Sequence, residues 1–163
     1  MSEAATGEFI VRDWRPEDRD AVISLHKELQ AYEIALRTSR SKKDEVSTEY
    51  VKELEEELCH PESEAAFFVA ERQEEVVGFV FCVAEEDMLD DPTAQVYVQD
   101  IMVTKNIRGV GVGKGLMQAV FDFAQKRDIT RINLMVLANN DEAINFYKNL
   151  GFQTAILHLE RTI

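Results

Sequence analysis

The sequence predicts one mixed α+β domain built around a mostly antiparallel sheet. The first observation is the order of the expected elements, in which two helices follow the first strand and three strands come next. The second is an apolar strand that passes through a glycine-rich turn into an amphipathic helix and on to another strand, which predicts one parallel pair. With 163 residues, 45% of them hydrophobic, the chain can bury a sizeable core. We expect residues 1–7 to form a loose tail and residues 8–163 to form the domain.

The first half of the chain has clear helix and strand signals. Pro16 suits the first turn of a helix, and Pro61 ends a second one. Two runs of apolar and β-branched residues flank the polar pair Gln73-Glu74, which predicts a β-hairpin. The expected elements are a strand at 9–14, helices at 16–36 and 47–59, and strands at 66–71 and 76–84. A basic, serine-containing loop is expected at 37–43.

The second half alternates strands and helices. After an expected loop at 90–92, we predict strands at 95–104, 131–137 and 152–160, with helices at 112–127 and 140–150. Apolar residues from Leu116 onward recur at helical spacing, whereas Val96 to Val103 is a nearly continuous apolar run typical of a buried strand.

The turn at 104–115 contains the most informative motif. Glycines at alternate positions let a backbone approach a ligand closely and turn successive N–H groups toward one point. The positive end of the following helix favours a phosphate there. An NTPase phosphate loop is excluded, because Gly109 to Gly113 is one residue short and Gly115 stands where Ser or Thr is needed. The dinucleotide fingerprint also fails, since its sixth position is Lys114 or Leu116. A plain flexible turn remains the alternative.

The charge distribution favours an anion at this turn. The chain carries 31 acidic and 18 basic residues, a net charge of −13. Residues 105–131 have a net positive charge instead, with six basic and two acidic residues. Lys126 and Arg127 suit the end of a helix, but Lys105, Arg108 and Lys114 have no such structural explanation. A basic island in an acidic protein would attract an anionic ligand.

A second motif spans residues 139–152 and predicts a short, capped helix. Asn139 and Glu142 have the spacing of a capping box, and Gly151 suits the position after the helix end. Tyr147 falls on the apolar stripe, where its hydroxyl would need a partner. From the pattern alone, Tyr147 is either an ordinary core tyrosine or a functional group.

Together the two motifs resemble a known family. Arg108-x-x-Gly111-x-Gly113, followed by Asn140-x-x-Ala143-x-x-x-Tyr147 and Gly151-Phe152, is similar to the signature of the GCN5-related N-acetyltransferases (GNAT), with some resemblance to spermidine/spermine acetyltransferases. The resemblance covers residues 8–163 and implies a twisted sheet of six to seven strands, split between the fourth and fifth strands and flanked by about four helices. It implies an acetyl-CoA-dependent N-acetyltransferase, acting by direct attack in a ternary complex. The alternatives are an acyl-CoA-binding or regulatory domain without catalysis, and a protein lysine or N-terminal acetyltransferase.

The resemblance also assigns roles to residues. Pantetheine would pair with the backbone near Ile101, Met102 and Val103, and a backbone amide near Met102 would stabilise the oxyanion. Tyr147 would protonate the leaving thiolate. The residues expected to hold coenzyme A are Ile101, Met102, Val103, Arg108, Gly109, Val110, Gly111, Val112, Gly113, Lys114, Asn140, Ala143 and Tyr147.

The general base departs from the family pattern. Where polyamine-acetylating relatives have a glutamate on the strand before the turn, this chain has Gln99, followed by Asp100. Adjacent strand residues face opposite sides, so Asp100 can replace the glutamate only if the strand is bulged or twisted. Glu33 is the second candidate base, because Tyr32-Glu33 resembles a pair at the acceptor pocket of the polyamine enzymes. Tyr32, Glu33 and Gln99 are the expected acceptor-binding residues.

The composition limits the classes of partner that the protein is expected to bind. Residues 44–91 hold 17 acidic residues against Lys52 and Arg72, which is either a solvated surface or an attraction for a cationic amine. This balance argues against nucleic acid as a partner. No metal-ligand spacing, transmembrane run or signal peptide is found, and two cysteines are too few for a disulfide framework. We expect a cytoplasmic homodimer that acetylates a small-molecule amine or a lysine.

Overall fold

The computed structural model describes residues 8–36, 46–86, 94–161 and 163. Its sheet has five strands in the order β1-β2-β3-β4-β5, and only the β4–β5 pair is parallel. The strands are β1 (Ile10–Asp13), β2 (Ala65–Arg72), β3 (Glu75–Glu86), β4 (Ala94–Val103) and β5 (Arg131–Leu134). The helices are α1 (Arg19–Leu36), α2 (Val46–Cys59), α3 (Val112–Gln125) and α4 (Asp141–Asn149). The predicted fold class is confirmed.

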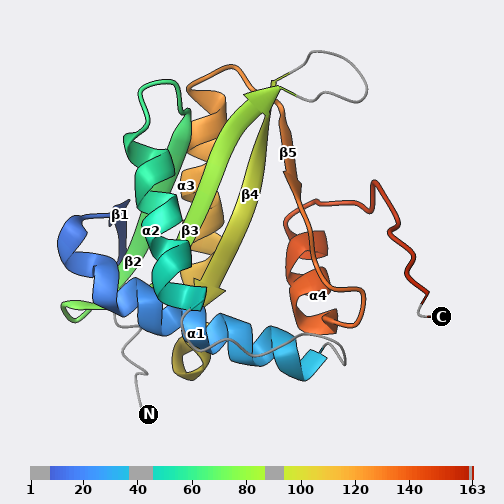
Figure 1. Ribbon diagram of the computed structural model, residues 1–163, viewed down its shortest axis with the longest axis horizontal. Coiled ribbons are helices and arrows are strands. Elements are labelled where there is room, and N and C mark those ends of the chain that lie inside the picture. The colour runs from blue at the N-terminus through green and yellow to red at the C-terminus, as the bar shows by residue number, and fades with distance from the viewer. Residues whose placement is uncertain (1–7, 37–45, 87–93, 162) are drawn as a thin grey trace, which may run out of the picture.

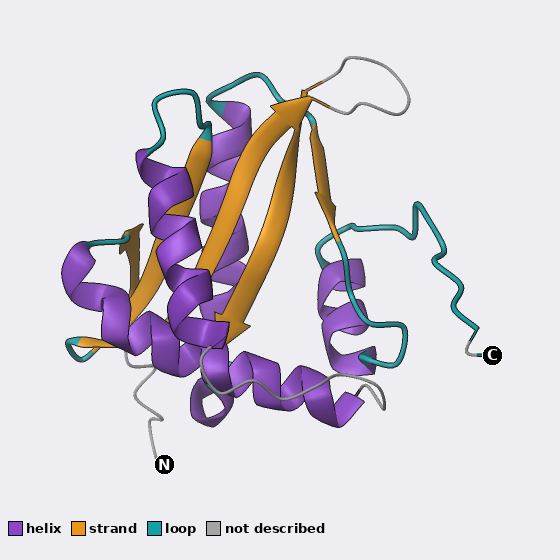
Figure 2. Ribbon diagram, in the orientation of Figure 1, coloured by secondary structure: helices purple, strands orange, loops and turns teal. Residues whose placement is uncertain are grey.

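Helices cover both faces of the sheet (Figures 1 and 2). On one face α1 and α2 contribute Val22, Leu25, Val51 and Leu54 to a core with alternate residues of β2 and β3. On the other face α3 packs its apolar stripe against the intervening strand residues. Because successive strand residues point to opposite faces, β2 and β3 supply both cores.

The β2–β3 hairpin turns at Gln73 and Glu74, as predicted. Both residues have positive φ, 52° and 65°. This is the conformation of a two-residue hairpin turn, which matches the twist of the flanking strands. The polar pair therefore forms the turn without glycine.

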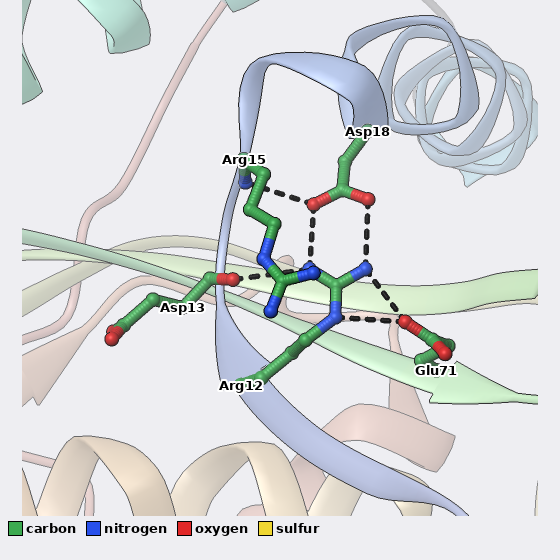
Figure 3. A network of polar contacts seen from close by, with 5 residues as sticks. All are labelled: Arg12, Asp13, Arg15, Asp18 and Glu71. Atoms are coloured by element: carbon green, nitrogen blue, oxygen red, sulfur yellow. Dashed lines mark hydrogen bonds and ion pairs between the residues drawn. The ribbon is translucent and has the colours of Figure 1, made fainter. Parts of the chain in front are cut away.

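A charged network fixes the chain between β1 and α1 (Figure 3). The Arg12 guanidinium donates to both Asp18 oxygens, at 2.7 and 2.9 Å, and to Glu71 on β2 at 2.8 Å. Asp18 lies in the 3-10 helix η1 (Pro16–Asp18), which forms the first turn of the predicted 16–36 helix. The hydrogen bonds from Arg12 hold the pKa of Asp18 below its ordinary value. The network ties the start of α1 to the sheet edge.

The sheet differs from expectation at the C-terminus. The described residues contain five strands rather than six to seven, and the predicted strand at 152–160 does not form. A strand exists only through its ladder partner, and in the described chain β5 pairs with β4 alone. Residues 152–161 lead away from the sheet beyond α4 (Figure 1). The loops expected at 37–43 and 90–92, and the tail at 1–7, lie outside the described residues.

Candidate active site at the β4–β5 split

The sheet opens between β4 and β5. Their pairing runs from Gln95↔Arg131 to Val98↔Leu134 and ends there. Beyond Val98, β4 continues to Val103 while paired with β3 only. Figure 1 shows the two strands close at one end and separating toward the other, with α4 beside the opening. The split predicted between the fourth and fifth strands is present.

A β-bulge begins where the strands separate. In the β3–β4 register Phe81 opposes Asp100 and Cys82 opposes Val98, so Gln99 is the extra residue. Phe81 belongs to the core under α1 and α2, and Cys82 to the core under α3. Opposed residues share a face, so the bulge places Asp100 on the α1–α2 face while Gln99 is exposed. The strand is therefore bulged at this point, which is the condition under which Asp100 can replace the glutamate of the relatives.

Asp100 accepts a hydrogen bond from one tyrosine and affects the pKa of two others. The Tyr50 hydroxyl, from α2, donates a hydrogen bond to Asp100 Oδ2. Burial raises the pKa of Tyr97, and the Asp100 charge raises it further. The same two causes, burial first, raise the pKa of Tyr147 to about 12. Tyr147 lies on α4 beside the split, so the Asp100 charge acts on a hydroxyl across the opening.

Tyr147 is half-buried against apolar neighbours. Its ring makes edge contacts with Phe146 and Phe152, with centroids 5.3 and 5.7 Å away. Within the described residues its hydroxyl makes no hydrogen bond. The packing fixes the ring and leaves the hydroxyl available, an arrangement that differs from that of an ordinary core tyrosine.

The glycine-rich turn has the backbone that its sequence predicts. Gly109 and Gly111 have φ values of 85° and 93°, and a Cβ at either position would meet nothing within 4 Å. These glycines serve the backbone conformation and leave open space beside it. Gly111 is the residue before α3, so the first-turn amides at 112–114 have no helical acceptor. Val110 and Lys114 are exposed, whereas Val112 is buried.

Gly113 instead serves close packing. A Cβ there would lie 3.2 Å from the Phe146 ring, so α3 approaches α4 at this position. The adjacent strand ends with Ile101 and Val103 on the α3 face and Met102, 3% exposed, on the α1–α2 face.

Arg108 contacts residues of three elements, β4, α4 and α1. Its Nε donates to the Val103 carbonyl at 3.2 Å, and its Nη1 lies 3.3 Å from the Glu142 carboxylate on α4. The guanidinium stacks over the Tyr32 ring, 5.3 Å from the centroid. Tyr32 in turn donates to Asn140 Oδ1 at 3.2 Å. Residues from α1, β4, the turn and α4 thus converge at the opening.

Asn140 caps α4. Its Oδ1 accepts from the Ala143 backbone N–H at 3.1 Å, which makes Asn140 the N-cap. The predicted capping box of Asn139 and Glu142 is therefore wrong by one residue, and the Asn139 side chain donates to the Leu36 carbonyl at the end of α1 instead. At the other end, Gly151 has φ 92° and the Phe152 N–H reaches the Tyr147 carbonyl, as the predicted cap requires.

Sequence reasoning missed three residues that organise the site. Tyr50 holds Asp100, and the buried His26 stacks on the Tyr50 ring. Glu28 on α1 accepts from Thr104 Oγ1 and from the Lys105 backbone, at 3.1 and 2.9 Å, and so holds the start of the turn. All three lie on helices whose pattern indicated only an apolar stripe, so no local signal marked them. Glu33 is half-buried beside Tyr32, and its predicted role stays a prediction.

Comparison with known proteins identifies the family. The model of the acetyltransferase (GNAT) family matches residues 25–152. The chain belongs to this family. An uncharacterized N-acetyltransferase of Methanocaldococcus jannaschii is 34% identical over 90 residues, 55% of this chain and 40% of the relative. An N-alpha-acetyltransferase of Sulfurisphaera tokodaii is 37% identical over 98 residues, 56% of this chain and 59% of the relative.

Solved structures agree on the fold. The BH1408 protein of Bacillus halodurans, in a mutant form, superposes with a TM-score of 0.85 at 19% identity, covering 94% of this chain and 99% of that one. GNAT proteins are acetyltransferases that use acetyl-CoA, so the predicted enzyme class and cofactor are those of the family. The chain spans about half or less of the length of several curated relatives, including 40% of the Methanocaldococcus protein.

Neither a membrane-spanning helix nor a metal-binding cluster is present in the described residues. No helix among them has the length and apolar character needed to cross a bilayer. No group of three or more His, Cys, Asp or Glu side chains there could hold a metal ion.

Proposed function

We propose that this protein transfers the acetyl group of acetyl-CoA to a primary amine of a cationic small molecule, by direct attack in a ternary complex. The observation that carries the proposal is the bulge at Gln99. It places Asp100, a proton acceptor, on the α1–α2 face at the point where β4 and β5 separate, while Tyr147, a proton donor, lies beside the same opening. An acid and a base near one split suit aminolysis of a thioester.

The cofactor would follow the open strand and the turn. Residues 99–103 of β4 lack a β5 partner, which suits pairing with the amide groups of pantetheine. The pyrophosphate would bind the amides from Arg108 to Lys114, where the helix dipole is favourable. The Arg108 guanidinium, which contacts the Glu142 carboxylate in the structure, would then bind the phosphates instead. Carboxylate and phosphate are both anions that a guanidinium can bind.

The reaction would proceed in one ternary complex. Asp100 takes a proton from the amine, directly or through a water molecule, and the amine nitrogen attacks the thioester carbonyl. The C–N bond forms, the C–S bond breaks, Tyr147 gives its proton to the departing thiolate, and the second proton that the acylated nitrogen loses restores the Tyr147 hydroxyl. The raised pKa of Tyr147 keeps that proton in place at neutral pH. A backbone amide near Met102 would stabilise the oxyanion.

The acceptor proposal rests on charge. The surplus of acidic residues would attract polyamines, aminoglycosides or lysine side chains. An amine panel at saturating acetyl-CoA, with thiol release as the readout, tests it. We expect a polycationic amine to be the best acceptor, with a KM that rises with salt as the Debye length falls from about 10 Å at 0.1 M to about 3 Å at 1 M. A neutral best acceptor with salt-independent KM would contradict the charge argument, and acetylation of peptide N-termini alone would favour a protein substrate.

We also propose a cytoplasmic homodimer. Both Cys59 and Cys82 are free thiols, which suits a reducing compartment. The apolar residues Ile156, Leu157 and Leu159, which follow α4 in the chain, are 80–89% exposed and suit contact with a second copy.

A further inference from the structure

A partly buried polar cluster that includes Asp100 lies on the α1–α2 face of the sheet. We define it as His26 on α1, Ser47 and Tyr50 on α2, and Asp100 on β4. His26 and Ser47 are 2% and 4% exposed. Buried polar groups are costly unless they are hydrogen-bonded, so the contacts within the cluster define its geometry.

The contacts form a chain that ends at Asp100. Ser47 Oγ lies 2.9 Å from His26 Nδ1, and Gln30 Nε2 lies 3.4 Å from His26 Nε2. The His26 ring stacks on Tyr50, with centroids 4.4 Å apart and planes 23° apart. The Tyr50 hydroxyl then donates to Asp100 Oδ2. Hydrogen bonds thus hold the imidazole, the imidazole supports the phenol ring, and the phenol holds one carboxylate oxygen.

Tyr50 can act only as a donor in this arrangement. Burial raises its pKa well above the ordinary value for tyrosine, and the Asp100 charge raises it further, with smaller effects from Glu53 and Tyr97. The hydroxyl therefore stays protonated at neutral pH. A permanent donor stabilises the charged form of the carboxyl that it contacts, and so lowers the pKa of that carboxyl.

We propose that Tyr50 is a positioning residue that holds Asp100 as an ionised carboxylate facing the acceptor amine, and that the His26 stack fixes the Tyr50 ring. The inference rests on the proposed function, in which Asp100 is the base. The hydrogen bond from Tyr50 would give the Asp100 carboxylate a defined orientation at the bulge, although the aspartate side chain is one methylene shorter than that of a glutamate. Among the described residues, Tyr97 on its own strand and Tyr147 on α4 are titratable groups whose pKa the Asp100 charge raises; on β3, the opposed residue is the apolar Phe81.

The test replaces the hydroxyl while keeping the ring. In Tyr50→Phe the carboxylate loses the hydrogen bond that the Tyr50 hydroxyl donates, so the pKa of Asp100 rises, and the acid limb of kcat/KM moves to higher pH by about one unit. Coenzyme A affinity, measured by calorimetry, should not change. Tyr97→Phe is the matched control, because the Tyr97 phenol is also near Asp100 but makes no hydrogen bond to it in the described structure. That variant should keep the wild-type acid limb.

A second measurement separates this inference from the proposed function. The Asp100 carboxyl carbon is titrated by ¹³C NMR in the substrate-free protein, with Asp100→Asn to assign the signal. A higher pKa in Tyr50→Phe than in both wild type and Tyr97→Phe supports the positioning role, even if no acceptor is found. An unchanged pKa overturns it. A raised carboxyl pKa with an unmoved acid limb would remove Asp100 as the base and the catalytic part of the inference with it.

Discussion

A single extra residue decides which face of the sheet Asp100 occupies. Without the bulge at Gln99, strand alternation would put Asp100 among the apolar residues under α3. The sequence could state this dependence but not resolve it, because a bulge is set by the register with β3. The role of Tyr50 could not be predicted for a similar reason, since its partner Asp100 lies 50 positions further along the chain. Local sequence therefore identified the residues of the turn and of α4 but not the group that holds Asp100.

Tyr147 provides the residue-level prediction. Tyr147→Phe should lower kcat by roughly 10²–10⁴-fold, because a positioned general acid contributes a factor of this size. Its pKa of about 12 implies that Tyr147 loses its proton only as the pH rises through that value. A fall in kcat that begins at a lower pH would therefore belong to another group. Steady-state kinetics from pH 6 to 10 measure both quantities.

Stability is the control for this variant. The Tyr147 hydroxyl makes no hydrogen bond within the described residues, so its removal should change the free energy of unfolding by less than about 1 kcal/mol. A larger loss of stability together with an unaltered kcat would identify an ordinary core tyrosine.

At the level of elements, prediction succeeded where the signal was local. The hairpin at Gln73-Glu74, the four helices and the turn before α3 depend on residues a few positions apart, and all are present. The strand at 152–160 has suitable β-branched and apolar residues but finds no ladder partner in the described chain. Its propensity was real, yet strand formation depends on a neighbour that sequence does not specify.

The turn before α3 gives a prediction at this scale. Gly111→Glu should weaken coenzyme A binding at least tenfold, because the side chain and its negative charge would enter the space where the pyrophosphate is proposed to bind. Calorimetry with coenzyme A measures the affinity. The substitution also forces a non-glycine residue into positive φ, which costs roughly 1–2 kcal/mol of stability.

Gly151→Glu is the matched control. Gly151 has φ 92°, close to the 93° of Gly111, and a Cβ there also meets nothing within 4 Å. Both variants should lose similar stability, and only Gly111→Glu should lose affinity. Equal coenzyme A affinities in the two variants would refute the proposed cofactor site.

At the level of the whole molecule, the apolar surface is unevenly distributed. Met135, Ile156, Leu157 and Leu159 are each at least 80% exposed, and all follow β5 in the chain. In the described residues β5 is an edge strand that pairs on one side only. Open edges with exposed apolar neighbours favour association through added strands. The region that does not form the predicted last strand is therefore where we place the interface of the proposed dimer.

Association through this region is testable by light scattering coupled to size-exclusion chromatography. We expect the wild type to be a dimer and Leu159→Glu to be a monomer, because a charge would be buried without a partner in the interface. Ile10→Glu is the control, since Ile10 is 56% exposed on β1, at the opposite edge of the sheet. It should remain dimeric. A monomeric wild type, or a dimer lost in Ile10→Glu but kept in Leu159→Glu, would refute the C-terminal interface, because the exposed apolar residues after β5 would then contribute nothing to assembly.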